Sequence, residues 1–268
     1  MNQKQYLVWL VRLLIGLTWL SIFGFAIYIL ANYVGSIFLG NPEKWNVLLP
    51  NLYTKDQLAA NFLIGIHFLS GAILLLLGPI QLLKKVRESY PHLHRTLGKL
   101  YLFSCYVVGV GGLGFVFVKG TIGGWPMNLG FGLYGFLVLI CAAGAHINAK
   151  NRNFNQHQAW AIRLFALVVG SWLYRMEYGF WEFLTGRIGH TKAFDGVFDI
   201  IMSFFFYIPN LILAELFIRK KLLAESKIAY TMTLIMLVCA NLIVVSGTYF
   251  FSKYIWLPTV IATLRKFV

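Results

Sequence analysis

The sequence predicts an all-α membrane protein, a bundle of about seven helices that each cross a lipid bilayer. Of its 268 residues, 59% are hydrophobic and only 12% are charged, whereas a soluble domain carries about 25% charged residues. The mean hydropathy is +0.72. A hydrocarbon core takes about 20 apolar helical residues to cross, and stretches of that length recur along the chain. The shorter alternating segments of a β-barrel do not appear.

Helices are favoured because each one satisfies its own backbone polar groups in lipid. The stretches that predict them are residues 6–32, 59–83, 98–119, 128–149, 159–184, 196–218 and 228–251. The first stretch follows Lys4 but exceeds the about 7–15 apolar residues of a signal peptide, and no small-residue cleavage motif closes it. No linker or soluble insert divides the chain, so we interpret residues 1–268 as a single membrane domain.

Basic residues predict the orientation of the bundle, because short loops rich in Lys and Arg stay in the cytoplasm. Such loops occur at about 84–97, 150–158 and 219–227, whereas the opposite loops balance their basic residues with acidic ones. We therefore expect a multi-pass protein of the bacterial inner membrane, with these loops and the N-terminus in the cytoplasm and the C-terminus outside.

The formal net charge of +14 is spread over loops beside helix ends rather than gathered in one module. Anionic lipid headgroups are therefore the expected partners, and nucleic acid is not expected. Disulfides and a zinc site are not expected either, because the three cysteines lie inside the apolar stretches without paired spacing.

The segment GVGGLG, from Gly109 to Gly114, matches the letters of a dinucleotide-binding motif. That motif needs a strand before it and a helix after it, whereas this segment lies within an apolar helix. Small residues let membrane helices approach closely. We therefore expect a tight contact between the helices at 98–119 and 128–149, which is also rich in glycine.

Ionisable side chains inside a span cost about 2.5–3.5 kcal/mol on insertion scales, so they usually face a cavity or a partner. Here they form two layers. The inner layer, near the basic loops, contains Gln81, Arg87, His94, Arg95, His146, His157, Trp160 and Arg163. The outer layer contains His67, Arg175, Glu177, Glu182 and Asp199.

Arg175 is expected to pair with an acid of the outer layer. Glu182 follows it by seven residues and projects from the same helical face, and Asp199 offers an acid on the next helix. Glu177 is turned away by about 200° and needs a partner of its own.

The inner histidines indicate a redox cofactor, because histidine is the commonest metal ligand and also an axial haem ligand. His94 and His157 begin helices that run in the same direction, so they could flank one haem b. Arg95 and Arg163 would then contact its propionates or a quinone carbonyl, and His146 lies at the same level. Alternatively, these histidines cap helix starts and the arginines bind lipid phosphate.

Two further expectations concern histidine positions. His67 and His146 differ by about 15 Å along the membrane normal, which disfavours a second haem between them. His94, one turn before Gly98, should point into the bundle, whereas His92, directly after a proline, should be a solvated loop residue.

The sequence also resembles a bacterial family of integral membrane proteins, domain of unknown function 2306. The motifs that carry the resemblance are HFLSGA from His67, GPIQ ending at Gln81, HRTLGKLY from His94 and HQAWAIR from His157. It covers about residues 60–180, with 1–58 and 196–268 as flanking segments, and it implies no activity. A more distant similarity is to transmembrane b-type cytochromes, in which paired histidines hold two haems within four helices.

Three functions follow as hypotheses. The first is a redox protein that holds a haem b or a quinone near the cytoplasmic face. The second is a transporter or lipid-handling protein that uses the polar layer of His67, Arg175 and Glu177. The third is a non-catalytic subunit that assembles with other membrane proteins. A redox partner or an oligomer is a separate expectation about partners. No Walker motif or serine nucleophile elbow is present, so ATP hydrolysis and acyl transfer are disfavoured, and whether the chain is an enzyme stays open.

The orientation can be tested by labelling single cysteines with a membrane-impermeant maleimide in a cysteine-free background. Lys220→Cys should react only from the cytoplasmic side, because it lies in a basic loop. Lys192→Cys, in an opposite loop, serves as the control and should react only from outside. Labelling of Lys220→Cys from outside alone would contradict the predicted orientation.

Overall fold

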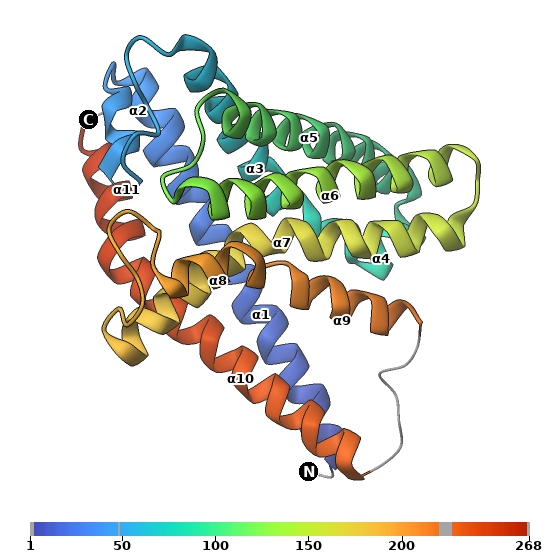
Figure 1. Ribbon diagram of the computed structural model, residues 1–268. Helices are drawn as coiled ribbons and strands as arrows, with labels where there is room; N and C mark the ends of the chain where they lie inside the picture. The colour runs from blue at the N-terminus through green and yellow to red at the C-terminus, as the bar shows by residue number, and fades with distance from the viewer. Residues whose placement is uncertain (1–2, 48, 220–226, 267–268) are drawn as a thin grey trace.

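The computed structural model describes residues 3–47, 49–219 and 227–266, and every regular element in these ranges is helical. The helices are α1 (Gln3–Ile29), α2 (Gly35–Phe38), α3 (Leu58–Leu82), α4 (Lys84–Ser89), α5 (Pro91–Val118), α6 (Gly124–Lys150), α7 (Phe154–Thr185), α8 (Val197–Phe205), α9 (Ile208–Ile218), α10 (Lys227–Phe251) and α11 (Leu257–Leu264). Short π-helical turns, Leu30–Val34 and Ser252–Trp256, join α1 to α2 and α10 to α11, and a 3-10 helix covers Pro42–Val47. The expected all-α bundle is confirmed (Figure 1).

Six helical stretches of the described residues have the length and composition to cross a membrane. They are Gln5–Phe38, Leu58–Leu82, Pro91–Val118, Gly124–Lys150, Val197–Ile218 and Tyr230–Leu264. The helix expected at 159–184 is also present as α7, whose 32 residues extend about 48 Å. It is long enough to cross but less apolar than the others, because it carries most of the charged outer layer.

The first and last helical stretches run further than the apolar pattern predicts. The helix expected at 6–32 continues through a π-helical turn to Phe38, and the helix expected at 228–251 continues to Leu264. A π-helical turn inserts a residue without ending the helix. The first stretch ends where Gly40 adopts a positive φ of 64°, a conformation that glycine adopts without strain.

The helix expected at 196–218 is broken into α8 and α9. Pro209 stands in the first turn of α9, because a proline has no N–H to donate and its ring clashes with the carbonyl four residues earlier. The two residues at the break, Phe206 and Tyr207, are buried. A break at membrane depth is tolerated where protein covers the backbone, and Gly170 of α7 supplies that cover: a Cβ there would lie 3.0 Å from the Phe206 carbonyl oxygen.

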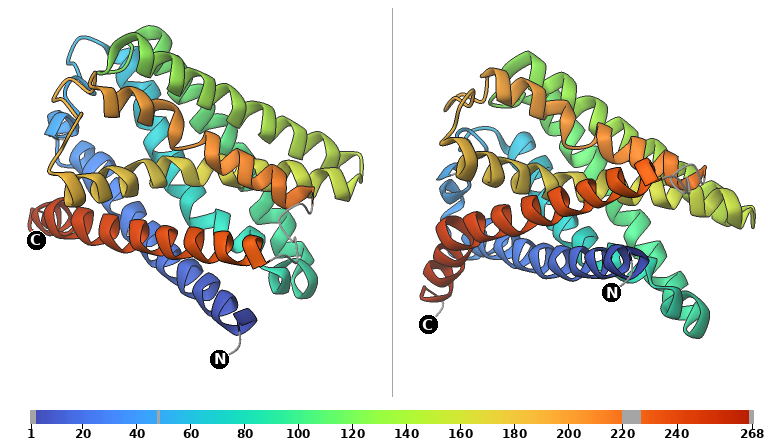
Figure 2. Two further views of the ribbon diagram at one scale, coloured as in Figure 1. Left: turned by 60° about the horizontal axis from the view of Figure 1, so that its bottom comes forward. Right: turned by 90° about the horizontal axis from the view of Figure 1, so that it is seen from below.

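The helices pack as neighbours in the order α1 with α3 and α10, α3 with α5, α5 with α6, α6 with α7, and α7 with α10 (Figures 1 and 2). We call the end that holds α4 and the turn at 151–153 the basic end, and the end that holds the segments 39–47, 49–57, 119–123 and 186–196 the loop end. The N- and C-termini lie at different ends of the bundle (Figure 1).

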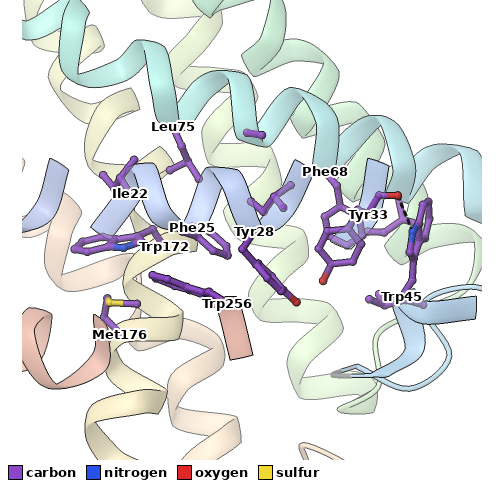
Figure 3. Packing of buried hydrophobic residues seen from close by; sticks show 14 of the residues in the cluster. Ile22, Phe25, Tyr28, Tyr33, Trp45, Phe68, Leu75, Trp172, Met176 and Trp256 are labelled. Atoms are coloured by element: carbon purple, nitrogen blue, oxygen red, sulfur yellow. Dashed lines mark hydrogen bonds between the residues drawn. The ribbon is translucent and has the colours of Figure 1, made fainter. Parts of the chain in front are cut away.

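An aromatic core joins α1 to α3, α7 and the last helical stretch near the loop end (Figure 3). The rings of Phe25 and Trp256 stack with centroids 5.5 Å apart, and those of Tyr33 and Phe68 stack at 3.7 Å. Trp45 Nε1 donates a hydrogen bond to the Tyr33 carbonyl oxygen at 3.0 Å. The 3-10 helix that carries Trp45 is thereby attached to the membrane helices, with its indole N–H satisfied.

The glycines of α5 face two neighbours rather than the single one predicted. Gly109 packs on α6 as expected, since a Cβ there would lie 2.6 Å from Leu139. Gly111 and Gly114 instead face α3, where added Cβ atoms would lie 2.7 Å and 2.9 Å from atoms of Leu63. Glycines of α5 therefore allow a close approach to α3 as well as to α6, and at Gly111 the neighbouring atom belongs to the α3 backbone. The apolar pattern of α5 does not distinguish these two faces, because both are buried.

This contact predicts opposite effects for two Gly→Ala substitutions. Gly111→Ala should lower the free energy of unfolding by about 1–3 kcal/mol, because its methyl group meets the Leu63 backbone. Gly132→Ala should leave stability unchanged or raise it, because nothing lies within 4 Å of a Cβ at that position and alanine favours the helix. Thermal unfolding in detergent micelles measures both, and equal midpoints for the two variants would contradict the close contact.

Candidate functional site

A cavity of about 530 Å³ lies among α1, α3, α5, α6 and α7 and reaches the loop end. Small-molecule sites in proteins have volumes of about 300–1,000 Å³, so this cavity has the size of a binding site. Its walls are mainly apolar, with Phe25 of α1, Phe68 of α3 and Phe131 of α6 among them. Its rim at the loop end includes residues 49–52 and Lys119.

Arg175 of α7 faces this cavity. Its Nη1 donates a hydrogen bond to the Ser171 carbonyl oxygen at 2.6 Å, and its guanidinium lies 4.7 Å from the centre of the Phe25 ring. A guanidinium has several further N–H donors. No carboxylate of the described residues forms an ion pair with Arg175.

The expected pairing of Arg175 with Glu182 or Asp199 is therefore wrong. Glu182 pairs instead with Arg187, whose Nε lies 2.6 Å from its Oε1, and Asp199 pairs with His190 at 2.7 Å. Both replacement partners come from the loop after α7. Helical periodicity cannot place such a loop, so it could not reveal this competition for the acids.

His67 of α3 lines the same cavity. Its Nδ1 lies 2.9 Å from the Val108 carbonyl oxygen, and because a carbonyl only accepts, Nδ1 carries the proton. Gly112 of α5 makes room for the ring, since a Cβ there would lie 2.8 Å from His67 Nδ1. In the neutral tautomer Nε2 is then left as an acceptor.

His67 and Arg175 lie at a similar depth. His67 comes nine residues after Leu58, where α3 begins, and Arg175 comes ten residues before Thr185, where α7 ends. At 1.5 Å per residue these separations correspond to about 14 Å and about 15 Å from the loop end. The two polar groups of the cavity therefore lie at a similar distance from the loop end.

Lys119 stands at the rim of the cavity, directly after α5. Its Nζ donates a hydrogen bond to Thr54 Oγ1 at 2.7 Å and lies 5.9 Å from the centre of the Phe115 ring. Burial lowers the pKa of Lys119 from its ordinary value, because removal from water disfavours the charged form. Lys119 was missed from the sequence, where a lysine after an apolar stretch has the pattern of any interfacial lysine.

The cavity wall carries a cationic side chain in Arg175 and another in Lys119, and no Asp or Glu of the described residues lines it. Low-dielectric walls of one charge sign concentrate the opposite ion. The cavity is therefore suited to an anion that also has a sizeable apolar part.

The other outer-layer acids lie outside this cavity. Glu177 Oε2 is buried and has no hydrogen-bond partner among the described residues. Asp199 is fully buried and accepts from the Tyr178 hydroxyl at 2.6 Å, His190 Nδ1 at 2.7 Å and the backbone N–H groups of Thr191 and Gly196 at 3.0 Å and 3.1 Å. Asp199 thus anchors the loop between α7 and α8. A sequence signal existed in Gly196-x-x-Asp199, which has the spacing of a capping box.

The inner layer is only partly brought together at the basic end. His94 is half-buried and its Nδ1 has no partner among the described residues. His92 is exposed, as predicted, but it lies in the first turn of α5 rather than in a loop. The Nδ1 atom of His157 contacts the Ala145 carbonyl oxygen at 2.8 Å.

The remaining inner residues have other contacts. Arg163 is held by Glu215 of α9, with Nη2 and Oε2 2.7 Å apart, and Arg95 is exposed, with its Nε bonded to the Pro91 carbonyl oxygen. His146 Nδ1 lies 3.4 Å from the Tyr106 hydroxyl. Among the described residues, no three His, Cys, Asp or Glu side chains are grouped to hold a metal ion.

Comparison with known proteins gives one result. A family model described as "Predicted membrane protein (DUF2306)" matches residues 64–218. The match extends beyond the resemblance seen at 60–180 and takes in α8 and α9. It includes His67 and Arg175 as well as the inner layer. No curated protein and no solved structure matches the chain.

Proposed function

We propose that this chain, which belongs to the DUF2306 family of predicted membrane proteins, binds an amphipathic anion in its intramembrane cavity. The anionic headgroup, a carboxylate or a phosphate, would lie beside Arg175, and the apolar part of the ligand would fill the aromatic and aliphatic remainder of the cavity. This is the lipid-handling alternative that the outer polar layer suggests from sequence.

The observation that carries the proposal is an arginine in a membrane-embedded cavity with no carboxylate partner among the described residues. A charge at that depth is costly unless it is paired. An oxyanion offers the planar guanidinium two acceptors at once, which is the strongest pairing that arginine forms. The contact with Phe25 at 4.7 Å holds the guanidinium on one side and leaves its other N–H groups for a ligand.

The rim of the cavity supports an anionic ligand as well. Lys119 would attract the headgroup at the loop end, and the headgroup would then move from Lys119 into the cavity to bind Arg175. With the basic loops in the cytoplasm, as the charge pattern predicts, this entrance lies on the outer face of the inner membrane. The anionic lipids expected as partners are then one source of ligand.

Binding can be tested with dodecyl phosphate, using dodecanol as the uncharged probe of the same chain length. For the parent protein in micelles, dodecyl phosphate should raise the unfolding midpoint and dodecanol should not. Arg175→Gln should weaken dodecyl phosphate binding by about tenfold or more, equivalent to about 1.4 kcal/mol.

Arg187→Gln is the matched control, because Arg187 lies outside the cavity and pairs with Glu182; it should bind dodecyl phosphate as the parent does. Without ligand, Arg175→Gln should not lower the unfolding midpoint, since Arg175 has no acid partner to lose. Equal affinity of the parent and Arg175→Gln, or equal effects of the two probes, would contradict the proposed function.

A second candidate function is a haem b or quinone site at the basic end, formed by His94 and His157. One contact favours it: His157 Nδ1 is bonded to the Ala145 carbonyl oxygen, the arrangement by which metal-binding histidines usually present Nε2. The unpartnered His94 Nδ1 is a further polar group that a ligand would satisfy. The arginines fit less well, because Arg163 is already paired with Glu215.

Pyridine-haemochrome and metal analysis decide this candidate. If haem is bound, His94→Ala and His157→Ala should each abolish it, because each would remove an axial ligand. His92→Ala should retain it, because His92 is exposed. A parent protein without haem, or three variants with equal haem content, would refute the haem site.

A further inference from the structure

A row of buried polar atoms without hydrogen-bond partners runs along the contact between α3 and α5 at the basic end. These atoms are Gln81 Nε2, His94 Nδ1 and the Tyr101 hydroxyl oxygen, and none has a partner among the described residues. Tyr101 is only 7% exposed. Leaving a buried donor without an acceptor costs free energy, so their recurrence in one place calls for an explanation.

The three side chains lie at the same helix contact, that of α3 with α5, because His94 and Tyr101 are spaced to face α3. His94, Gly98 and Tyr101 follow one another by four and three residues and so lie on one face of α5. Gln81 packs against that face, with its Oε1 3.3 Å from a Cβ built on Gly98. Tyr101 packs on Gly78 of α3, where a Cβ would lie 3.5 Å from its ring. We call Gln81, His94 and Tyr101 the inner polar seam.

The atoms of the seam have a common chemistry. An amide NH₂ and a phenol hydroxyl both donate hydrogen bonds, and an imidazole nitrogen donates when it carries a proton. None of the three side chains is an acid. The seam therefore complements oxygen atoms, as Arg175 does at the other level of the bundle.

A thin layer of buried residues separates the seam from the cavity. Leu74 and Val138 line the cavity and also belong to the core cluster that contains Tyr101 and Cys105. Along α5, Tyr101 lies seven residues closer to the basic end than the cavity residue Val108, which corresponds to about 10 Å. Cys105 lies between them and is fully buried.

We propose that the inner polar seam is a second headgroup subsite, and that the chain moves an amphipathic anion between the cavity and the basic end. In this structure the layer of Leu74, Cys105 and Val138 closes the way to the seam, and its opening would let the headgroup pass from Arg175 to Gln81, His94 and Tyr101. The proposal rests on the proposed function, because it concerns the same ligand. The unpartnered donors of the inner polar seam would then bind the headgroup after it has passed the layer of Leu74, Cys105 and Val138.

Transfer can be measured with radiolabelled dodecyl phosphate in proteoliposomes, as the fraction that becomes protected from extraction by external albumin. The parent should transfer the probe faster than protein-free vesicles. Gln81→Leu and Tyr101→Phe should each slow transfer by about fivefold or more, because each removes a donor from the seam. Their affinity for dodecyl phosphate in micelles should stay that of the parent, since neither residue lines the cavity.

Tyr90→Phe is the control for loss of a hydroxyl, because Tyr90 lies near the same end but is 56% exposed; it should transfer the probe as the parent does. Thermal unfolding distinguishes a structural role for Tyr101. Tyr101→Phe should raise the unfolding midpoint, because it removes a buried hydroxyl that has no partner. A lower midpoint, or unchanged transfer, would overturn the proposal.

Cys105 provides a test that needs no ligand. In a variant with Cys141→Ala and Cys239→Ala, opening of the layer should expose Cys105 to alkylation by N-ethylmaleimide faster than global unfolding does. Alkylation no faster than unfolding would overturn the path. Normal dodecyl phosphate binding with transfer at the protein-free rate would also overturn it while leaving the proposed function intact, whereas a parent protein that does not bind the probe would count against the proposed function itself.

Discussion

The close approach of α3 to α5 is the contact on which the cavity and the inner polar seam both depend. It is possible because glycines of α5 leave space where a Cβ would meet the backbone or side chain of α3. Toward the loop end, Gly112 accommodates the His67 ring and so places a polar group at the cavity wall. Toward the basic end, Gly98 accommodates Gln81. One helix pair therefore carries polar groups at two depths, and small residues set the position of each group.

Electrostatics in the bundle is governed by how acids are distributed. Glu182 forms an ion pair with Arg187, and Asp199 pairs with His190. Glu215 pairs with both Arg163 and Arg219. Among the described residues these pairs lie outside the cavity, so its wall remains cationic. Because these acids are paired outside the cavity, Arg175 remains available to an anion.

The broken helix contributes to the same arrangement. The helix is interrupted between α8, which ends at Phe205, and α9, which has Pro209 in its first turn. Phe206 lies at this interruption and forms part of the cavity wall. Asp199 fixes the start of α8 through bonds to the loop that precedes it. Close contacts on Gly130 and Gly170, made by Ser203 and Phe206, hold the broken segment against α6 and α7. A continuous helix would present a different face to the cavity.

The sequence by itself determined the class of the protein and most of its helices. These properties depend on the length of apolar stretches and on helical periodicity, both of which act locally. Only the tertiary structure decided which acid each arginine meets, which helix each glycine of α5 faces and where a cavity remains. Arg175 shows the reason: its expected partners were taken by residues of a loop whose position depends on long-range contacts. Periodicity along one helix carries no information about that competition.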